Sequence, residues 1–175
     1  MKKMLKNEGF TLIELLIVVA IIGIIAAIAV PGLLRARQSG NEASAIGSMR
    51  AINSSEVTYA ASCGGGGYAT TLANLATPPT AGGDPFISPD LNANGVVKSG
   101  YTLQLDPGTG AIAVLAAAAT CNGTASQSTY HATATPATKG QTGTRSFATN
   151  NSGTIYQAFD GNVIAATMAG AQILQ

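Results

Sequence analysis

The N-terminal part of the chain is dominated by one uninterrupted apolar run. From Phe10 to Leu34, about 25 residues, the only ionisable side chain is Glu14. At about 1.5 Å per residue, a helix of this length can cross the hydrocarbon core of a bilayer. Lys2, Lys3 and Lys6 precede the run, and a positive flank of this kind is retained on the cytoplasmic side. The pattern predicts a membrane-spanning helix with its N-terminus in the cytoplasm.

A second helical pattern continues from Gly32 to about Cys63 and has one apolar face. At roughly 100° per residue, eight positions share this face: Ala45, Ile46, Met49, Ile52, Val57, Tyr59, Ala60 and Cys63. Glu56 falls among them, and Ser44, Ser48, Ser55 and Thr58 lie around the other side. Joined to the first half, this gives a helix from Phe10 to Ser62, about 80 Å long. We expect its second half to be buried against a domain, and its first half to be covered by lipid or by other copies of the chain.

The rest of the chain reads as a small antiparallel sheet. Gly64 to Gly67 end the helix, and residues 68–76 are predicted to form a short helix. After Gly100 the pattern alternates with a period of two, which is typical of strands. Residues 101–105 and 111–115 are expected to form a hairpin, and residues 129–135, 145–148 and 154–157 further strands. The predicted fold class is α+β, with the second half of the long helix covering a sheet of four or five strands.

Composition excludes an electrostatic binder of polyanions. Only 10% of the residues are charged, and the formal net charge is +1. Loss of residues 1–9 would remove three lysines and one glutamate and change this charge to −1, before the new N-terminus is counted. Neither value favours nucleic acid as a partner.

Glu14 is the unusual residue of the apolar run, because a charge within a membrane segment is costly and tends to be functional. The stretch Gly9-Phe10-Thr11-Leu12-Ile13-Glu14 resembles the processing site of type IV prepilins and of type II secretion pseudopilins. The resemblance implies cleavage between Gly9 and Phe10 by a prepilin peptidase, which also methylates the new amino terminus of Phe10. It covers about the first 40 residues, and a helix packed on an antiparallel sheet is also the fold that it implies.

The resemblance divides the chain into four parts. Residues 1–9 form a cytoplasmic leader that is removed, residues 10–34 the transmembrane and assembly half of the helix, residues 35–63 its amphipathic half, and residues 64–175 an extracytoplasmic globular region. In the family, a glycine and a proline at the positions of Gly23 and Pro31 bound the segment that can extend in the filament. Glycine and proline both weaken a helix, so this segment is a candidate soft region; a static kink at Pro31 with Gly23 as a packing contact is the alternative.

Cleavage would create an ammonium group on Phe10, about one helical turn from the Glu14 carboxylate. Opposite charges attract strongly in a medium of low dielectric, and each is costly there without a partner. We hypothesise that Glu14 of one subunit pairs with the Phe10 ammonium of a neighbour and so sets the register of a helical bundle.

Two other interpretations of the N-terminus remain. Ala27-Ile28-Ala29 could serve as a signal-peptide cleavage site, which would give a soluble secreted protein that begins at Val30. Glu14 could also lie at headgroup level on a plain membrane anchor. The first alternative conflicts with the length of the apolar run, and the second leaves the Gly9-Phe10 junction unexplained.

Little else in the sequence indicates chemistry. Cys63 and Cys121 would lie outside the cytoplasm, where thiols oxidise, and are predicted to form a disulfide. Asp90, Asn92 and Asn94 match only the start of a calcium loop, because Tyr101 stands where a bidentate Glu is needed. His131 is the single histidine, which excludes a multi-histidine metal site and favours a structural or surface role.

The sequence therefore predicts a structural protein and not an enzyme such as a membrane-tethered hydrolase, with no cofactor. We expect a pilus subunit that enters the inner membrane, is processed after Gly9, and polymerises with copies of itself through its apolar helix. The expected partners are the prepilin peptidase and methyltransferase and an inner-membrane assembly machinery, and the expected destination is an extracellular pilus. A periplasmic pseudopilus of a type II secretion system is the alternative.

Overall fold

A computed structural model describes residues 9–174, which divide into two units, one up to Ala36 and one from Arg37 onward. Helix α1 (Leu12–Ser62) contributes to both. The elements that follow it, in chain order, are β1 (Tyr68–Ala69), α2 (Leu72–Ala76), the 3-10 helix η1 (Pro89–Leu91), β2 (Val96–Lys98), β3 (Tyr101–Pro107), β4 (Ala113–Leu115), the 3-10 helix η2 (Ala117–Ala119), β5 (Ser126–Gln127), β6 (Tyr130–Pro136), β7 (Ser146–Asn150), β8 (Ile155–Ala158) and β9 (Gln172–Ile173).

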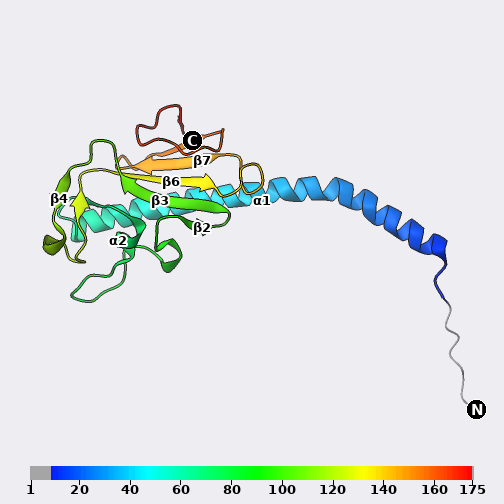
Figure 1. The fold of residues 1–175 in the computed structure, drawn as a ribbon, viewed down its shortest axis with the longest axis horizontal. Coiled ribbons are helices and arrows are strands. Elements are labelled where there is room, and N and C mark those ends of the chain that lie inside the picture. The colour runs from blue at the N-terminus through cyan, green and yellow to red at the C-terminus, as the bar shows by residue number, and fades with distance from the viewer. Residues whose placement is uncertain (1–8, 175) are drawn as a thin grey trace, which may run out of the picture. The chain divides into compact units, whose positions relative to one another are not determined.

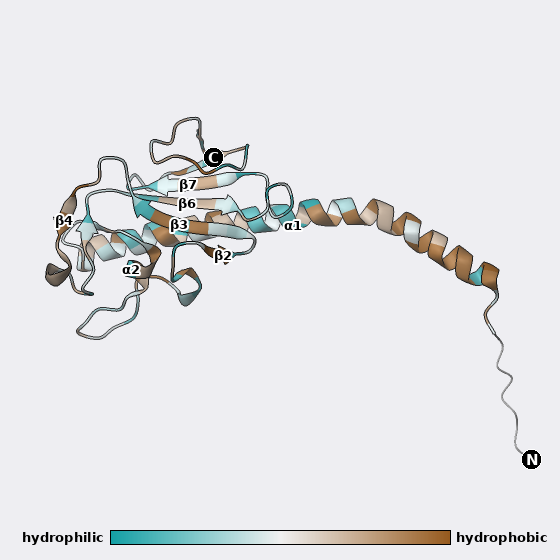
Figure 2. Cartoon of the chain, viewed as in Figure 1, coloured by the Kyte–Doolittle hydropathy of each residue, from teal (hydrophilic) through white to brown (hydrophobic). Residues whose placement is uncertain are grey.

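The first unit consists of the apolar half of α1. Its large apolar side chains, from Phe10 to Leu34, are between 43% and 87% exposed. Figure 2 shows most residues in this half of the helix in the brown of hydrophobic side chains. By length and composition, α1 can cross a membrane. The described part of the chain therefore supplies no cover for this surface.

The second unit is built on an antiparallel sheet of six strands in the order β2-β3-β6-β7-β8-β9. Figure 1 shows β3, β6 and β7 side by side along the C-terminal half of α1. A second sheet, in the order β1-β5-β4, is formed by residues that follow the helix in the sequence. The α+β prediction is confirmed, because the fold combines one long N-terminal helix with antiparallel sheets.

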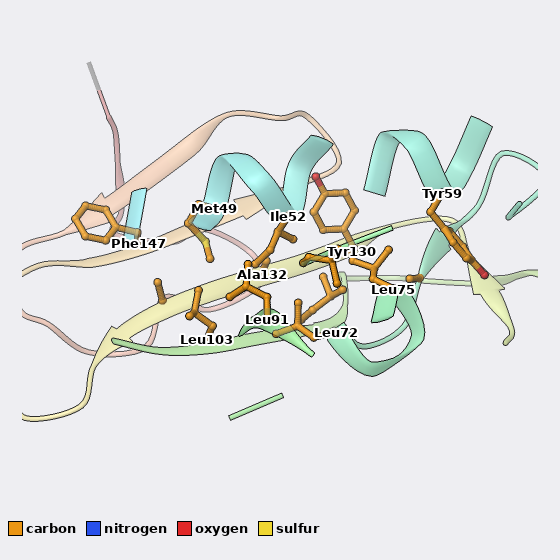
Figure 3. Packing of buried hydrophobic residues seen from close by; sticks show 14 of the residues in the cluster. Met49, Ile52, Tyr59, Leu72, Leu75, Leu91, Leu103, Tyr130, Ala132 and Phe147 are labelled. Atoms are coloured by element: carbon orange, nitrogen blue, oxygen red, sulfur yellow. The ribbon is translucent and has the colours of Figure 1, made fainter. Parts of the chain in front are cut away.

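The core forms where α1 meets the six-stranded sheet. Helix residues at intervals of three and four are buried: Glu42, Ala45, Ser48, Met49, Ile52, Ser55, Glu56 and Tyr59. Figure 3 shows Met49 and Ile52 against Leu103, Ala132 and Phe147 of the sheet. Leu72, Leu75 and Leu91 close the core below them. Burial of these side chains provides most of the driving force that holds the helix on the sheet.

The predicted buried face of the helix was partly wrong. Val57 is 62% exposed, whereas Ser48 and Ser55, expected on the opposite side, are buried. A serine can enter a helix contact at low cost because its hydroxyl is able to bond the preceding turn. Ser48 does so, since its Oγ donates to the carbonyl of Ser44 at 3.1 Å. Hydropathy alone therefore misplaced the edges of the face.

One hairpin prediction and one helix prediction were also wrong. The expected hairpin of residues 101–105 and 111–115 is absent, because β3 pairs with β2 and β6, and β4 pairs with β5 in the other sheet. The helix expected over residues 68–76 is shorter, because Tyr68–Ala69 forms β1 and α2 begins only at Leu72. Thr71 sets that start, since its side chain accepts a hydrogen bond from the backbone N–H of Asn74 and caps the helix.

Helix α1 ends in the glycine run, as the sequence predicted. The N–H groups of Cys63 and Gly64 both donate to the carbonyl of Tyr59, and Gly66 donates to Ala60. Gly65 and Gly66 have φ values of 61° and 87°, a left-handed conformation that glycine adopts without steric strain. The chain therefore reverses direction directly after the helix and enters the small sheet.

Candidate functional site: the N-terminal assembly segment

The start of α1 is fixed by a reciprocal pair of hydrogen bonds between Thr11 and Glu14. The backbone N–H of Thr11 donates to Glu14 Oε2 at 2.9 Å, and the backbone N–H of Glu14 donates to Thr11 Oγ1 at 3.3 Å. The Thr11 hydroxyl also donates to the same carboxylate oxygen at 2.7 Å. This arrangement is a capping box, in which two side chains satisfy N–H groups that the first turn leaves unpaired.

Sequence analysis did not find this capping box. The signal was present, because Thr-x-x-Glu before an apolar run is the pattern of such a box. Glu14 therefore has a role within its own chain, at the start of its helix. Both bonds that Glu14 accepts go to Oε2, and no residue from 9 to 174 donates to Oε1. That second oxygen is available to a donor from another molecule.

The predicted processing site lies immediately before this turn. Gly9 and Phe10 are exposed and precede the first helical residue, Leu12. Leader residues 1–8 lie outside the described residues. Exposure and irregular backbone at the Gly9-Phe10 bond are compatible with attack by a peptidase, but cleavage and methylation stay predictions.

Helix α1 continues without interruption through Gly23 and Pro31. Proline lacks the N–H that would bond to the carbonyl of Ala27, four residues earlier, so the helix lacks one internal hydrogen bond there. A Cβ placed on Gly23 would meet no atom within 4 Å. Packing within this chain therefore does not explain the glycine, and its role as a soft point or as a contact between copies stays a prediction.

A polar cluster fixes the loop of residues 138–145 to α1. The carboxylate of Glu42 accepts hydrogen bonds from the backbone N–H groups of Thr144 and Arg145 at 3.0 and 3.2 Å, and from the Thr144 hydroxyl at 3.1 Å. The guanidinium of Arg145 contacts the other carboxylate oxygen through Nε and Nη2, both at 2.8 Å. Gln38 and Asn41 donate to carbonyls of the same loop, at 2.6 and 2.8 Å. We call Gln38, Asn41, Glu42 and Arg145 the collar.

The Glu42 carboxylate is held in its charged form by the collar. Burial alone would raise the pKa of this group, but the hydrogen bonds from Thr144 and Arg145 and the charge of Arg145 together lower it below its ordinary value of 4.5. Sequence reasoning gave this residue no role, because its partners follow it by about 100 residues.

The two cysteines form the disulfide that the sequence predicted. Cys63 at the end of α1 is bonded to Cys121 in the segment before β5. Beside it, the buried amide of Asn122 donates to the carbonyls of Asn74 and Thr77, at 2.9 and 3.2 Å. The bond and the amide together join the helix end, α2 and the second sheet.

The candidate calcium loop is engaged in protein contacts. The Asp90 carboxylate lies 2.6 Å from the Lys98 ammonium, which occupies the place next to the carboxylate that a cation would take. The Asn94 amide accepts from the backbone N–H groups of Leu72 and Leu105 and donates to the carbonyl of Leu105. Between residues 9 and 174, no three His, Cys, Asp or Glu side chains are grouped as metal ligands would be. Calcium binding at Asp90, Asn92 and Asn94 stays an untested prediction.

Comparison with known proteins locates the similarity at the N-terminus. Residues 4–30 match a family described as the prokaryotic N-terminal methylation motif. Residues 4–30 therefore carry the N-terminal motif that is typical of type IV pilins and pseudopilins. We call residues 4–30 the pilin-type segment. It contains Gly9, Phe10, Glu14 and Gly23, so the match covers most of the predicted assembly residues.

Three relatives share this part of the chain. The chain is 43% identical over 54 residues to the type IV major pilin protein PilA of Myxococcus xanthus, which is 31% of this chain and 24% of that protein. It is 63% identical over 35 residues to the type IV wide pilus major component PilA4 of Thermus thermophilus, covering 20% and 27% of the two chains. It is 39% identical over 59 residues to the type II secretion system core protein G of Vibrio cholerae, covering 34% and 40%.

The matches therefore span only about a quarter to two fifths of these relatives. No solved structure matches the chain. The likeness rests on the pilin-type segment and the turns of α1 that follow it, while the sheets beyond residue 64 are described from this structure alone.

Proposed function

We propose that the chain is a structural subunit of a type IV pilus-like filament, cleaved after Gly9, N-methylated at Phe10 and polymerised through the apolar half of α1. The observation that carries the proposal is the pilin-type segment itself: an exposed apolar helix with one carboxylate, directly after a Gly-Phe junction. A catalytic role has no comparable support, because the relatives are named as pilus and secretion-system components.

The apolar surface of α1 determines where the subunit can exist. Fifteen or more large apolar side chains in water would be strongly unfavourable, at about 25 cal/mol for each Å², so the segment lies in the inner membrane before assembly and against other copies afterwards. Transfer from lipid to a helix bundle gains little from the exclusion of water. Specific packing and charge pairing must therefore favour the assembled state, and an inner-membrane machinery is the partner that would supply the work.

Glu14 is suited to such charge pairing after cleavage. Its Oε2 stays in the capping box with Thr11, while Oε1 accepts no hydrogen bond from residues 9–174 and can accept one from another molecule. The new ammonium of Phe10 on a neighbouring subunit is the donor that we propose. The intramolecular cap would hold the carboxylate in one position, so that less conformational entropy is lost on pairing.

The processing step is tested by mass spectrometry of the chain isolated from its native membrane. We expect an N-terminus at Phe10 that carries one methyl group. A chain that begins at Met1 would contradict processing, and a chain that begins at Val30 would support the secreted soluble alternative.

The assembly step is tested with two variants that separate the cap from the charge. Glu14→Val removes both, and we expect normal cleavage but loss of filaments. Thr11→Ala removes the hydroxyl of the cap and keeps the carboxylate, and we expect filaments to form at reduced yield. Wild-type filament yield from Glu14→Val would show that the carboxylate has no role in assembly.

The similarity to type II secretion system core protein G supports a second candidate function. In this alternative the subunit builds a short periplasmic pseudopilus. Deletion of the gene separates the two functions, since loss of surface filaments under the electron microscope supports a pilus, whereas intact filaments with failed export of secreted enzymes support a pseudopilus.

A further inference from the structure

The connection between β8 and β9, residues 159–171, contacts β6 and β7 of the six-stranded sheet. We call this connection the strap. Figure 1 shows this C-terminal part of the chain, in orange to red, next to β7. At one end, Gly161 lies against the carbonyl of Thr144, 3.0 Å from where its Cβ would be, and the ammonium of Lys139 donates to Asn162 Oδ1 at 3.3 Å.

At its other end the strap reaches the edge of β6 and β7. Ala166 lines a small cavity of about 120 Å³ together with Thr129 and Asn150. Between these two ends, the backbone of Ile164 lies close enough to the His131 imidazole in β6 to raise its pKa. The strap thus reaches β6 near His131 and β7 near both of its ends.

The surface under the strap is polar, unlike the surface under α1. Tyr130, Ala132 and Ala134 of β6 belong to the core, so His131 and Thr133 between them face the strap. These two residues are only 7% and 6% exposed.

Buried polar atoms without hydrogen-bond partners collect on this side of the sheet. In the described part of the chain there are four such atoms, and three belong to residues on the strap side: Thr129 Oγ1, His131 Nε2 and Ser146 Oγ. Buried polar atoms normally have partners, and an unpaired one destabilises the closed form. In the open form, water could form hydrogen bonds with these polar atoms, which the closed strap leaves without partners.

Few contacts oppose this tendency to open. Of the large apolar side chains on the strap, Ile164 is buried and Met168 is half-buried, whereas Phe159 and Val163 are 61% and 68% exposed. Strand β9, which follows the strap, pairs with β8 through only two residue pairs. Segments with few buried apolar contacts open at low free energy.

His131 is the titratable group at the centre of this layer. Asp106 of β3 lies opposite it in register on one side, and the uncharged Asn150 of β7 lies opposite it on the other. From the strap, the facing group is the backbone of Ile164, and the strap's own carboxylate, Asp160, interacts instead with Asn162 and Lys139. An imidazolium under the closed strap would have one carboxylate near it but little access to water.

We propose that the strap is an acid-opened cover, in which protonation of His131 releases residues 159–171 and exposes the polar face of β6 and β7. The direction follows from burial, which lowers the pKa of His131 below its ordinary value of 6.5 and outweighs the opposite effects of Asp106 and Ile164. The open form, whose imidazole is hydrated, binds the proton more tightly. The strap is therefore most stable above about pH 6.5 and loses stability as the pH falls towards the lowered pKa.

Hydrogen exchange of the full chain in detergent micelles tests the proposal, with amide protection corrected for the intrinsic exchange rate at each pH. Between about pH 7 and about pH 5, we expect protection of the strap, relative to β3, to fall by about tenfold for each unit by which the His131 pKa lies below 6.5. In His131→Gln this pH dependence should disappear. The matched control is Ser146→Ala, which removes another unpaired group under the strap but does not titrate, and should keep the pH dependence.

Constant protection of the strap in the wild-type chain, or an equal loss of protection in His131→Gln, would overturn the proposal. A second measurement covers the case in which the variant does not fold. A chain without an affinity tag has a single histidine, so its imidazole signal can be followed by NMR. An ordinary pKa near 6.5 with no change in strap signals across the titration would also overturn the proposal.

Discussion

The buried carboxyl group of Glu56 leads to a quantitative prediction about stability and pH. This side chain of α1 is 0% exposed, its Oε2 accepts a hydrogen bond from the backbone N–H of Ala69 at 2.9 Å, and its Oε1 has no partner in the structure. Burial raises the pKa of Glu56 from 4.5 to about 8, and the Ala69 hydrogen bond offsets only part of this effect. At pH 7 the group is therefore a neutral acid in the folded chain and a carboxylate in the unfolded chain.

A raised acid pKa means that folding takes up a proton above pH 4.5. The contribution of Glu56 to stability is therefore complete below about pH 4.5 and is lost as the pH rises towards 8. The contribution of Glu56 to the free energy of unfolding should fall by about 1.4 kcal/mol per pH unit across this range, which amounts to about 5 kcal/mol in total.

Glu56→Gln has almost the same shape and cannot titrate, so it isolates this effect. The amide can still accept from Ala69, and its unpaired NH₂ group adds a constant cost of about 1–3 kcal/mol. The stability of the variant relative to the wild type should rise by about 1.4 kcal/mol per pH unit between pH 5 and pH 8. Urea unfolding in detergent, followed by the near-ultraviolet circular dichroism of the tyrosines, measures this difference, because the chain contains no tryptophan.

Glu42→Gln on the same helix is the control. Burial would raise the pKa of Glu42, but its hydrogen bonds and Arg145 lower it, so its contribution is lost only as the pH falls below about 4.5. Its difference curve should be flat between pH 5 and pH 8. Parallel curves for the wild type and Glu56→Gln over the same range would refute the assignment of a neutral, buried Glu56.

Three further predictions concern the second unit. Glu42→Ala removes the carboxylate partner of Arg145, whose guanidinium then keeps only Gln157 Oε1, and should lower the free energy of unfolding by about 3–5 kcal/mol, measured by urea unfolding; a loss below 1 kcal/mol would show that the pair is exposed in solution. Replacing Cys63 and Cys121 together by serine should cost about 4 kcal/mol, because the bond joins residues 58 apart, and reduction of the wild type should give the same shift in melting temperature. Gly64→Ala would place a Cβ in steric overlap with the carbonyl oxygen of Gly67, so we expect a lower melting temperature than for Gly66→Ala at an open site, although Gly66 has the positive φ.

The helix and the pilin-type segment could be predicted from sequence because their signals are local. An apolar run, a glycine stop and a period near 3.6 are all contained within a few turns. Thr11 and Glu14 form a local motif as well, and the pattern Thr-x-x-Glu would have revealed their capping box.

The partners of the strands could not be predicted in the same way. Residues 101–105 and 111–115 both alternate, but alternation says nothing about which strand lies beside which. In the structure β3 pairs with β6, about 30 residues later, and β4 pairs with β5. The collar was missed for the same reason, since Glu42 and its loop are brought together only by the completed fold.

Glu56 shows a different limit. Its position within the apolar face was visible in the sequence, but charged residues are rarely buried, so the pattern did not decide whether the side chain enters the core. The structure instead buries the side chain and gives it one backbone donor. A neutral carboxyl group can occupy such a place, and composition offers no way to recognise the protonation state in advance.

The positions of the collar and the disulfide have a mechanical consequence. A force applied to α1 from its N-terminal side reaches Gln38, Asn41 and Glu42 first, and these residues share the load among several hydrogen bonds and an ion pair. The covalent link at Cys63 lies at the opposite end of the same helix. If the collar yields under tension, the load passes through this bond from Cys63 to Cys121, so residues 64–120, which include β1, α2, β2, β3 and β4, cannot be pulled out end to end.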